Sequence, residues 1–169
     1  MFKKIVLLGL LSNSANCFAD KITDIVEFFS FKCSHCASVN DKLAQYVSDN
    51  HIKFLDVNVD PGSMNTMIMY YVAVNAGVGV KFKQIYFKAV SQGMTAYSED
   101  TLAYVVGLVK NEAMRHLILS KTERQRIKDK MNYAQSLLGR YTVSETPTFL
   151  INKTTLLSGE DVINQLSNE

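Results

Sequence analysis

The sequence predicts an α/β fold in which a helical insert separates a strand–helix–strand unit from a closing hairpin and helix. Strand-like runs at 25–29 and 53–59 flank a helical pattern at 37–49, and strand character returns only at 148–152. Between about residues 64 and 141 the chain carries helical signals alone. A strand–helix–strand unit of this length implies parallel strands joined by a right-handed crossover.

The first strand is predicted over 25–29 because this run is rich in β-branched and aromatic residues. The helix that follows, 37–49, has apolar residues at helical spacing, namely Val39, Leu43, Tyr46 and Val47. The second strand, 53–59, is stopped by the turn residues Asp60-Pro61-Gly62-Ser63. These elements build the opening unit of the fold.

Four helices are predicted in the insert. The first covers 64–76 and the second 80–92, each followed by glycine. The third begins near Ser98 and continues through Leu102, Val105, Val109 and Ala113. The fourth begins at Ser120, which forms a capping box with Glu123, and its buried stripe is Ile127, Met131, Ala134 and Leu138. A hairpin over 148–158 and a helix over 160–166 close the chain.

A cluster of methionine and tyrosine residues opens the insert, and two interpretations of it stay open. Its members are Met64, Met67, Met69, Tyr70 and Tyr71. Methionine is flexible and polarisable, so the cluster could offer an adaptable surface to unfolded substrates. The alternative is that these side chains fill the core between the insert helices.

The N-terminus has the three regions of a secretory signal peptide: Met1-Phe2-Lys3-Lys4, an apolar stretch at 5–11, and small residues that end at Cys17-Phe18-Ala19. The apolar stretch is shorter than the roughly 20 residues of a membrane span. We expect residues 1–19 to be removed by cleavage after Ala19, with Ala15 as the alternative site. The mature chain then has sixteen basic and sixteen acidic residues, which argues against nucleic acid or a membrane surface as partner.

Two closely spaced cysteines, in Cys33-Ser34-His35-Cys36, lie between the first strand and the first helix. A thiol at a helix N-terminus is favoured as the thiolate, the nucleophile of disulfide exchange, and the second cysteine lies one turn further along. His35 could add charge or a hydrogen bond near the Cys33 sulfur. A zinc site and a purely structural disulfide are the alternatives, but zinc lacks ligands beyond scattered histidines and Cys17, and so short a loop constrains the unfolded chain little.

Four features occur together in this chain: the strand Val26-Glu27-Phe28-Phe29-Ser30-Phe31, the Cys33–Cys36 pair, the helical insert and Thr146-Pro147. With them, the chain resembles the DsbA family of periplasmic thiol-disulfide oxidoreductases. The resemblance implies a thioredoxin-like fold from residues 20–62 and 142–169, with an inserted helical domain at 63–141. It also implies that the mature protein is periplasmic and passes a Cys33–Cys36 disulfide to exported proteins.

Roles for individual residues also follow from the resemblance. Cys33 is expected to form the mixed disulfide and Cys36 to resolve it, while Ser34, Thr146 and a cis Pro147 face the substrate. Glu27 is expected to be a carboxylate buried beneath the site without a cation, with a raised pKa, exchanging a proton as Cys36 changes state.

The resemblance also implies partners, namely reduced or unfolded exported proteins and a membrane reoxidant of the quinone-linked DsbB type. We expect no metal or other cofactor. Ser34, Lys32 and Thr146 depart from the residues usual in the family. They leave open an isomerase or reductase kept reduced by a partner, and a peptide-binding chaperone of the envelope.

Overall fold

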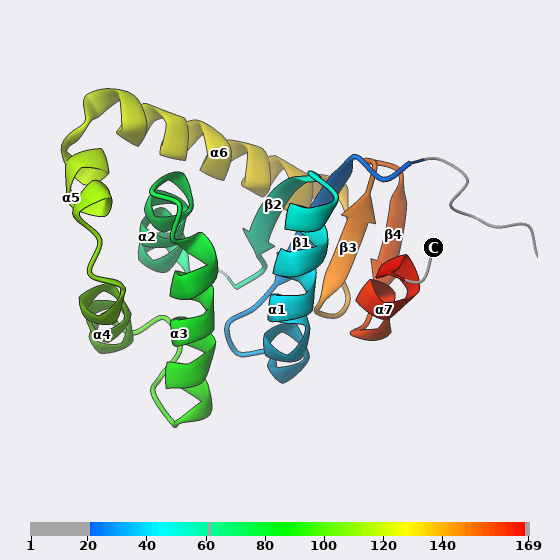
Figure 1. Ribbon diagram of the computed structural model, residues 1–169, viewed down its shortest axis with the longest axis horizontal. Helices are drawn as coiled ribbons and strands as arrows, with labels where there is room; N and C mark the ends of the chain where they lie inside the picture. The colour runs from blue at the N-terminus through cyan, green and yellow to red at the C-terminus, as the bar shows by residue number, and fades with distance from the viewer. Residues whose placement is uncertain (1–20, 61, 168–169) are drawn as a thin grey trace, which may run out of the picture.

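The computed structural model describes residues 21–60 and 62–167, so the predicted signal peptide and Cys17 lie outside the described residues. The predicted α/β fold is confirmed. The chain forms β1 (Asp24–Phe29), α1 (Ser34–Asp49) and β2 (Lys53–Asn58), then the insert helices, and finally β3 (Thr148–Ile151), β4 (Thr155–Ser158) and α7 (Asp161–Ser167). Figure 1 shows the insert as one side of the molecule and the sheet with α1 and α7 as the other.

The sheet has the strand order β2-β1-β3-β4, in which β1 and β2 run parallel and the other pairs run antiparallel. Side chains of β1 alternate between the two faces. Val26 and Phe28 pack with Ala134 and Leu137 of α6 on one face, whereas Ile25 packs with residues of α1 and α7 on the other. The pleat therefore turns Glu27 toward the face that α1 covers.

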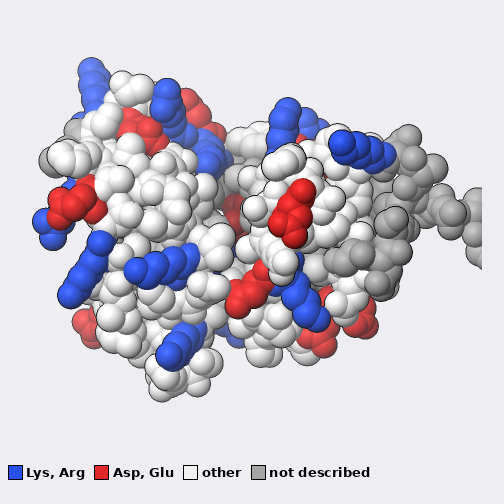
Figure 2. Space-filling view, viewed as in Figure 1, with Lys and Arg blue, Asp and Glu red and all other residues white. Residues whose placement is uncertain are grey.

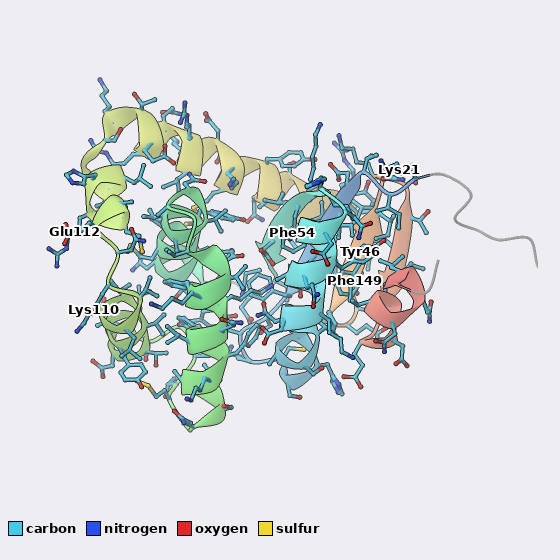
Figure 3. All side chains as sticks on the ribbon, in the orientation of Figure 1. Lys21, Tyr46, Phe54, Lys110, Glu112 and Phe149 are labelled. Atoms are coloured by element: carbon cyan, nitrogen blue, oxygen red, sulfur yellow. The ribbon has the colours of Figure 1, made fainter. Side chains whose placement is uncertain are left out.

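The core between the sheet and its two flanking helices contains Leu43, Phe149 and Ile163, all almost fully buried. Figure 3 shows Tyr46 of α1 with Phe54 and Phe149 of the strands on this side of the molecule. Tyr46 and Phe54 are partly exposed at the edge of the core. This packing fixes α1 over the sheet and so fixes the position of its N-terminus.

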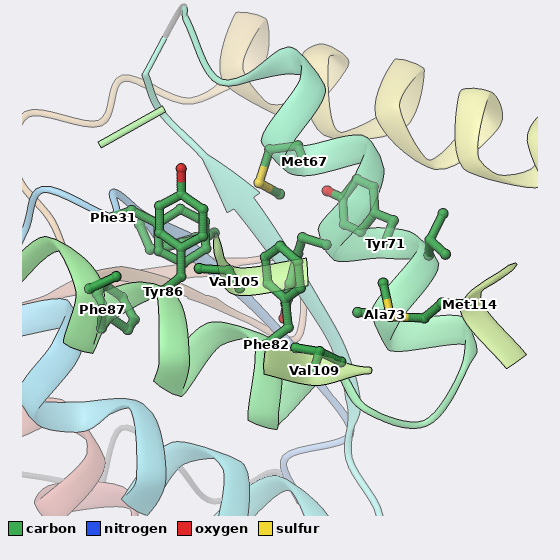
Figure 4. Packing of buried hydrophobic residues seen from close by; sticks show 14 of the residues in the cluster. Phe31, Met67, Tyr71, Ala73, Phe82, Tyr86, Phe87, Val105, Val109 and Met114 are labelled. Atoms are coloured by element: carbon green, nitrogen blue, oxygen red, sulfur yellow. The ribbon is translucent and has the colours of Figure 1, made fainter. Parts of the chain in front are cut away.

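The insert comprises α2 (Met64–Asn75), α3 (Gly79–Ser91), α4 (Glu99–Val109), α5 (Glu112–Leu119) and α6 (Lys121–Arg140). Its core is rich in aromatic rings, and Figure 4 shows Phe31 of the loop after β1 packed on Tyr86 of α3. Their ring centroids are 4.0 Å apart. Helix α6 belongs to both halves, because Ile127 lies in the insert core while Ala134 and Leu137 lie against the sheet.

Two helix predictions were wrong at their ends. Helix α1 begins at Ser34 rather than at residue 37, because Cys33 caps it. The predicted third helix does not continue through Ala113: Lys110 adopts a left-handed conformation with φ 40°, and Asn111 then caps a separate helix, α5. Asn111 accepts a hydrogen bond from the Met114 N–H, which provides a new start that the apolar spacing did not reveal.

The two interpretations of the methionine and tyrosine cluster apply to different members. Met67, Tyr70 and Tyr71 are buried in the insert core. Met64 is 60% exposed and Met69 is half-buried. The cluster therefore supplies both core and surface.

Candidate active site at the start of helix α1

Cys33 is the N-cap of α1. Its backbone is extended, with φ −88° and ψ 113°, and its Sγ accepts a hydrogen bond from the Cys36 N–H at 3.1 Å. The first-turn N–H groups of a helix lack partners within the helix and carry the positive end of its dipole. The Cys33 sulfur occupies the place that a serine or aspartate oxygen usually takes at such a terminus.

The two thiols differ in their exposure. Both are free, but Cys33 is partly exposed whereas Cys36 is fully buried. Burial, followed by the hydrogen bond with Cys33, raises the pKa of the Cys36 thiol well above its usual range. Only Cys33 is accessible to a partner's sulfur, and Cys36 is disfavoured as a thiolate.

The loop before β3 lies against the Cys33 sulfur. The Thr146–Pro147 peptide bond is cis, and the Cys33 Sγ donates a hydrogen bond to the Thr146 carbonyl at 3.2 Å. The contact is made by the backbone of Thr146 and not by its hydroxyl. Ser34 is exposed beside Cys33, so the structure brings Ser34, Thr146 and Pro147 to the same edge.

The two charged neighbours of Cys33 are engaged elsewhere. The His35 Nδ1 lies 3.1 Å from Glu160 Oε2, and among the described residues no hydrogen bond joins His35 to the Cys33 sulfur. The described part of the chain thus gives no hydrogen bond of this kind, and the alternative, that the charge of His35 acts on the sulfur, stays a prediction. The Lys32 Nζ lies 3.2 Å from Asp60 Oδ1.

Glu27 is fully buried beneath the site, but it has a cation beside it, and the expectation of a carboxylate without one was wrong. Lys83 of α3 places its Nζ 2.5 Å from Glu27 Oε2 and 2.5 Å from Asp56 Oδ1. Lys83 is itself only 3% exposed and lies 4.2 Å from the centroid of the Phe29 ring. No sequence pattern marked Lys83 or Asp56, because their partners are distant along the chain.

One ammonium group serves two carboxylates in this cluster, and the two are not equivalent. Asp56 also accepts a hydrogen bond from the Tyr70 hydroxyl, while Glu27 Oε1 is buried with no hydrogen-bond partner. Burial raises the pKa of Glu27 to about 8; the charge of Lys83 opposes this shift and that of Asp56 adds to it. Glu27 therefore holds a proton near neutral pH.

When Glu27 is ionised, its negative charge contributes to the raised pKa of the Cys36 thiol. A cavity of about 320 Å³ between α1 and the insert reaches Asp56 and Lys83 from the other side. Figure 2 shows the hollow between these two halves of the molecule. Asp56 and Lys83 therefore line an open recess, whereas Glu27 does not.

Tyr97 links the insert to the loop that precedes Cys33. Its hydroxyl accepts hydrogen bonds from the Phe31 N–H at 2.9 Å and from Asn58 Nδ2 at 2.7 Å, and it donates to Asp60 Oδ2 at 2.6 Å. Its backbone has φ 64°, an uncommon conformation for a residue other than glycine. Sequence reasoning missed Tyr97, because the loop before α4 carried no recognisable motif.

The fold and this arrangement define a thioredoxin-like protein with a cysteine pair at the start of its first helix. The sequence model of the Thioredoxin family matches residues 21–165, so the chain belongs to that family. The predicted resemblance to DsbA proteins is confirmed at the level of the fold.

Several solved structures share the fold, helical insert included. DsbA from Pseudomonas aeruginosa is 17% identical, with a TM-score of 0.65 over 89% of this chain and 83% of that one. The thiol-disulfide exchange protein α-DsbA2 from Wolbachia pipientis is 17% identical, with a TM-score of 0.59 over 86% and 78%. A cysteine-to-serine variant of Proteus mirabilis DsbA, in complex with a non-covalently bound peptide PWATCDS, is 20% identical, with a TM-score of 0.57 over 86% and 89%.

No helix in residues 21–60 and 62–167 is long and apolar enough to cross a membrane. Within the same ranges, no group of three or more histidine, cysteine, aspartate or glutamate side chains is placed to hold a metal ion.

Proposed function

We propose that this protein is a thiol:disulfide oxidoreductase of the periplasm that introduces disulfides into exported proteins. One observation carries the proposal: an accessible sulfur caps a helix, and the second sulfur lies buried one turn behind it. A partner can reach only Cys33, so the mixed disulfide forms there. The signal-like N-terminus supports the location.

The reaction begins with the Cys33–Cys36 disulfide. A client thiolate attacks the Cys33 Sγ, a client–Cys33 bond forms, and the electron pair of the broken bond goes to Cys36. A second client thiolate then attacks the client sulfur and releases Cys33 as the thiolate. The client loses two electrons to the cysteine pair, and the Cys36 N–H at 3.1 Å stabilises the departing Cys33 sulfur.

Glu27 handles the proton of the buried thiol. The leaving Cys36 thiolate is disfavoured by burial and must take up a proton. Glu27 holds one near neutral pH and has a free oxygen, so it supplies the proton as Cys36 is released and accepts it on reoxidation.

The backbone before Pro147 provides the edge for an extended client. Thr146 lies within hydrogen-bond distance of Cys33, so a client paired with this backbone has its cysteine beside the reactive sulfur. The cysteine-containing peptide bound by the Proteus mirabilis relative is consistent with such a client. A quinone-linked membrane protein of the DsbB type is the proposed reoxidant.

The test is oxidation of a reduced two-cysteine peptide by the purified mature protein, followed by mass spectrometry of the product. We expect stoichiometric oxidation by wild type and none by Cys33→Ser. When the oxidised form of the same peptide is mixed with Cys36→Ser, the Cys33 thiolate should attack the peptide disulfide, and a mixed disulfide at Cys33 should accumulate because Cys36 cannot resolve it. Absence of that adduct on non-reducing gels would refute Cys33 as the attacking thiol.

The second candidate is an isomerase or reductase kept reduced by a partner. The departures from the usual family residues at Ser34, Lys32 and Thr146 favour it. Thiol trapping in the native cell separates the two: a largely oxidised pair supports disulfide donation, and a largely reduced pair supports the alternative.

A further inference from the structure

An open groove runs between α2 and α6 on the insert, closed at one end by α5. We call it the α2–α6 groove. Its cavity is about 490 Å³, and its apolar lining is formed mainly by Met64, Ile68, Met69, Ile118, Ile127 and Met131. Figure 1 shows α6 passing over α2, with α5 beside their ends.

Two apolar residues of this groove are exposed to solvent, one on α2 and one on α5, whereas Ile127 of α6 is buried. Met64 is 60% exposed and Ile118 is 39% exposed. Contiguous exposed apolar surface of this kind marks an interaction site. Methionine side chains suit such a site, because they adapt to partners of different shape.

The charged side chains that line the groove are both basic. Arg124 and Lys128 lie four residues apart on α6, so they share one face of the helix. Arg124 donates a hydrogen bond to the Ile118 carbonyl, which holds it at the α5 end. Figure 2 shows Lys and Arg side chains along the edge of the molecule over α5 and α6.

Neither acidic residue of α6 lines the groove. Glu123 is buried and bonded to Asn75, and Asp129 accepts a hydrogen bond from Gln125. An occupant with carboxylates at the Arg124–Lys128 end and apolar side chains along the rest complements the lining. From Arg124 to Gln135 the groove follows α6 for about 16 Å, about three helical turns.

The groove also leads toward the cysteine pair. A smaller cavity of about 280 Å³ shares Met64, Met131 and Gln135 with it and extends to Asp60. Asp60 in turn is bonded to Lys32 and Ser30, in the loop that carries Cys33. A chain bound in the groove can therefore continue toward the reactive sulfur.

We propose that the α2–α6 groove docks client polypeptides, through an apolar segment of about three helical turns with acidic residues at the end that meets Arg124 and Lys128. This rests on the proposed function, because the clients are those that react at Cys33. The groove would select clients by a segment distant from their cysteine.

The test uses a fluorescein-labelled, cysteine-free peptide of fourteen residues, with leucines at its fourth, seventh, eighth and eleventh positions and glutamates at both ends. A matched peptide carries lysines in place of the glutamates. Fluorescence anisotropy with the oxidised mature protein should show the acidic peptide binding about tenfold more tightly than the basic one in low salt.

Substitutions in the groove should separate charge from apolar contact. Lys128→Glu should weaken the acidic peptide about fivefold and strengthen the basic one, whereas Lys121→Glu, outside the groove on the same helix, should change neither by more than about twofold. Met64→Gln and Met131→Gln should each weaken the acidic peptide about threefold, with circular dichroism spectra that match wild type.

The proposal would be overturned if the two peptides bound equally tightly, or if Lys128→Glu kept the preference of wild type for the acidic peptide. It would also be overturned if the protein bound palmitate and neither peptide. A reduced two-cysteine peptide extended by the acidic segment should also show a KM about fivefold lower than the unextended peptide, and Lys128→Glu should remove this gain. If the protein bound the cysteine-free peptide tightly but oxidised no thiol, the groove proposal would be supported and the proposed redox function would be rejected.

Discussion

Glu27→Gln is expected to remove most of the pH dependence of stability between pH 4.5 and 8. The carboxyl of Glu27 is fully buried, and its pKa rises from 4.5 to about 8 on folding. The folded protein therefore holds a proton that the unfolded chain has lost in this range. Because the folded state binds more protons, the free energy of unfolding falls as the pH rises through the range.

The size of the effect follows from the same shift. Each pH unit between the unfolded and folded pKa values corresponds to about 1.4 kcal/mol, so wild type should lose up to about 5 kcal/mol between pH 4.5 and 8. The stabilisation is complete below pH 4.5. Glutamine has nearly the same shape and cannot ionise, so the variant should lose far less over the same range.

Urea unfolding of the reduced protein at pH 5, 6, 7 and 8, followed by far-UV circular dichroism, measures the free energy at each pH. Glu112→Gln is the matched control, since its carboxylate is 81% exposed, and its pH profile should match that of wild type. Parallel profiles for wild type and Glu27→Gln would refute the inference that Glu27 carries a buried proton.

Three further substitutions test individual polar contacts of the fold. Lys83→Met leaves the buried carboxyl groups of Glu27 and Asp56 without their cation and should destabilise the fold by about 3–5 kcal/mol at pH 7 in urea unfolding. Tyr97→Phe removes four hydrogen bonds around the cysteine loop and should cost about 1–3 kcal/mol and alter the rate of thiol exchange with glutathione, whereas the exposed Tyr104→Phe should change neither. Ser120→Ala removes the N-cap of α6 and should lower the thermal midpoint by the equivalent of about 1 kcal/mol; an unchanged midpoint would contradict the capping contact.

Much of the fold could be predicted from local sequence patterns. The strands at 25–29 and 53–59 and the capping box at Ser120 were predicted because their signals lie within a few residues of each other. The break at Lys110 was missed, since a left-handed residue without glycine leaves the apolar spacing on either side intact.

The candidate site, too, could be predicted only in part. The spacing of Cys33 and Cys36 placed one thiol at the helix start and the other a turn behind, because helix geometry is local. The environment of Glu27 was not readable, since Lys83 lies 56 residues away along the chain. A buried charge depends on whichever neighbours the tertiary packing supplies.

The sequence by itself therefore determined an α/β chain with a cysteine at the start of a helix, because strand, helix and cap signals act over a few residues. The tertiary structure alone decided the surroundings of those cysteines. It brought Lys83 under Glu27, Tyr97 onto the loop before Cys33, and α2 beside α6, since each contact joins segments whose meeting depends on how the insert packs on the sheet.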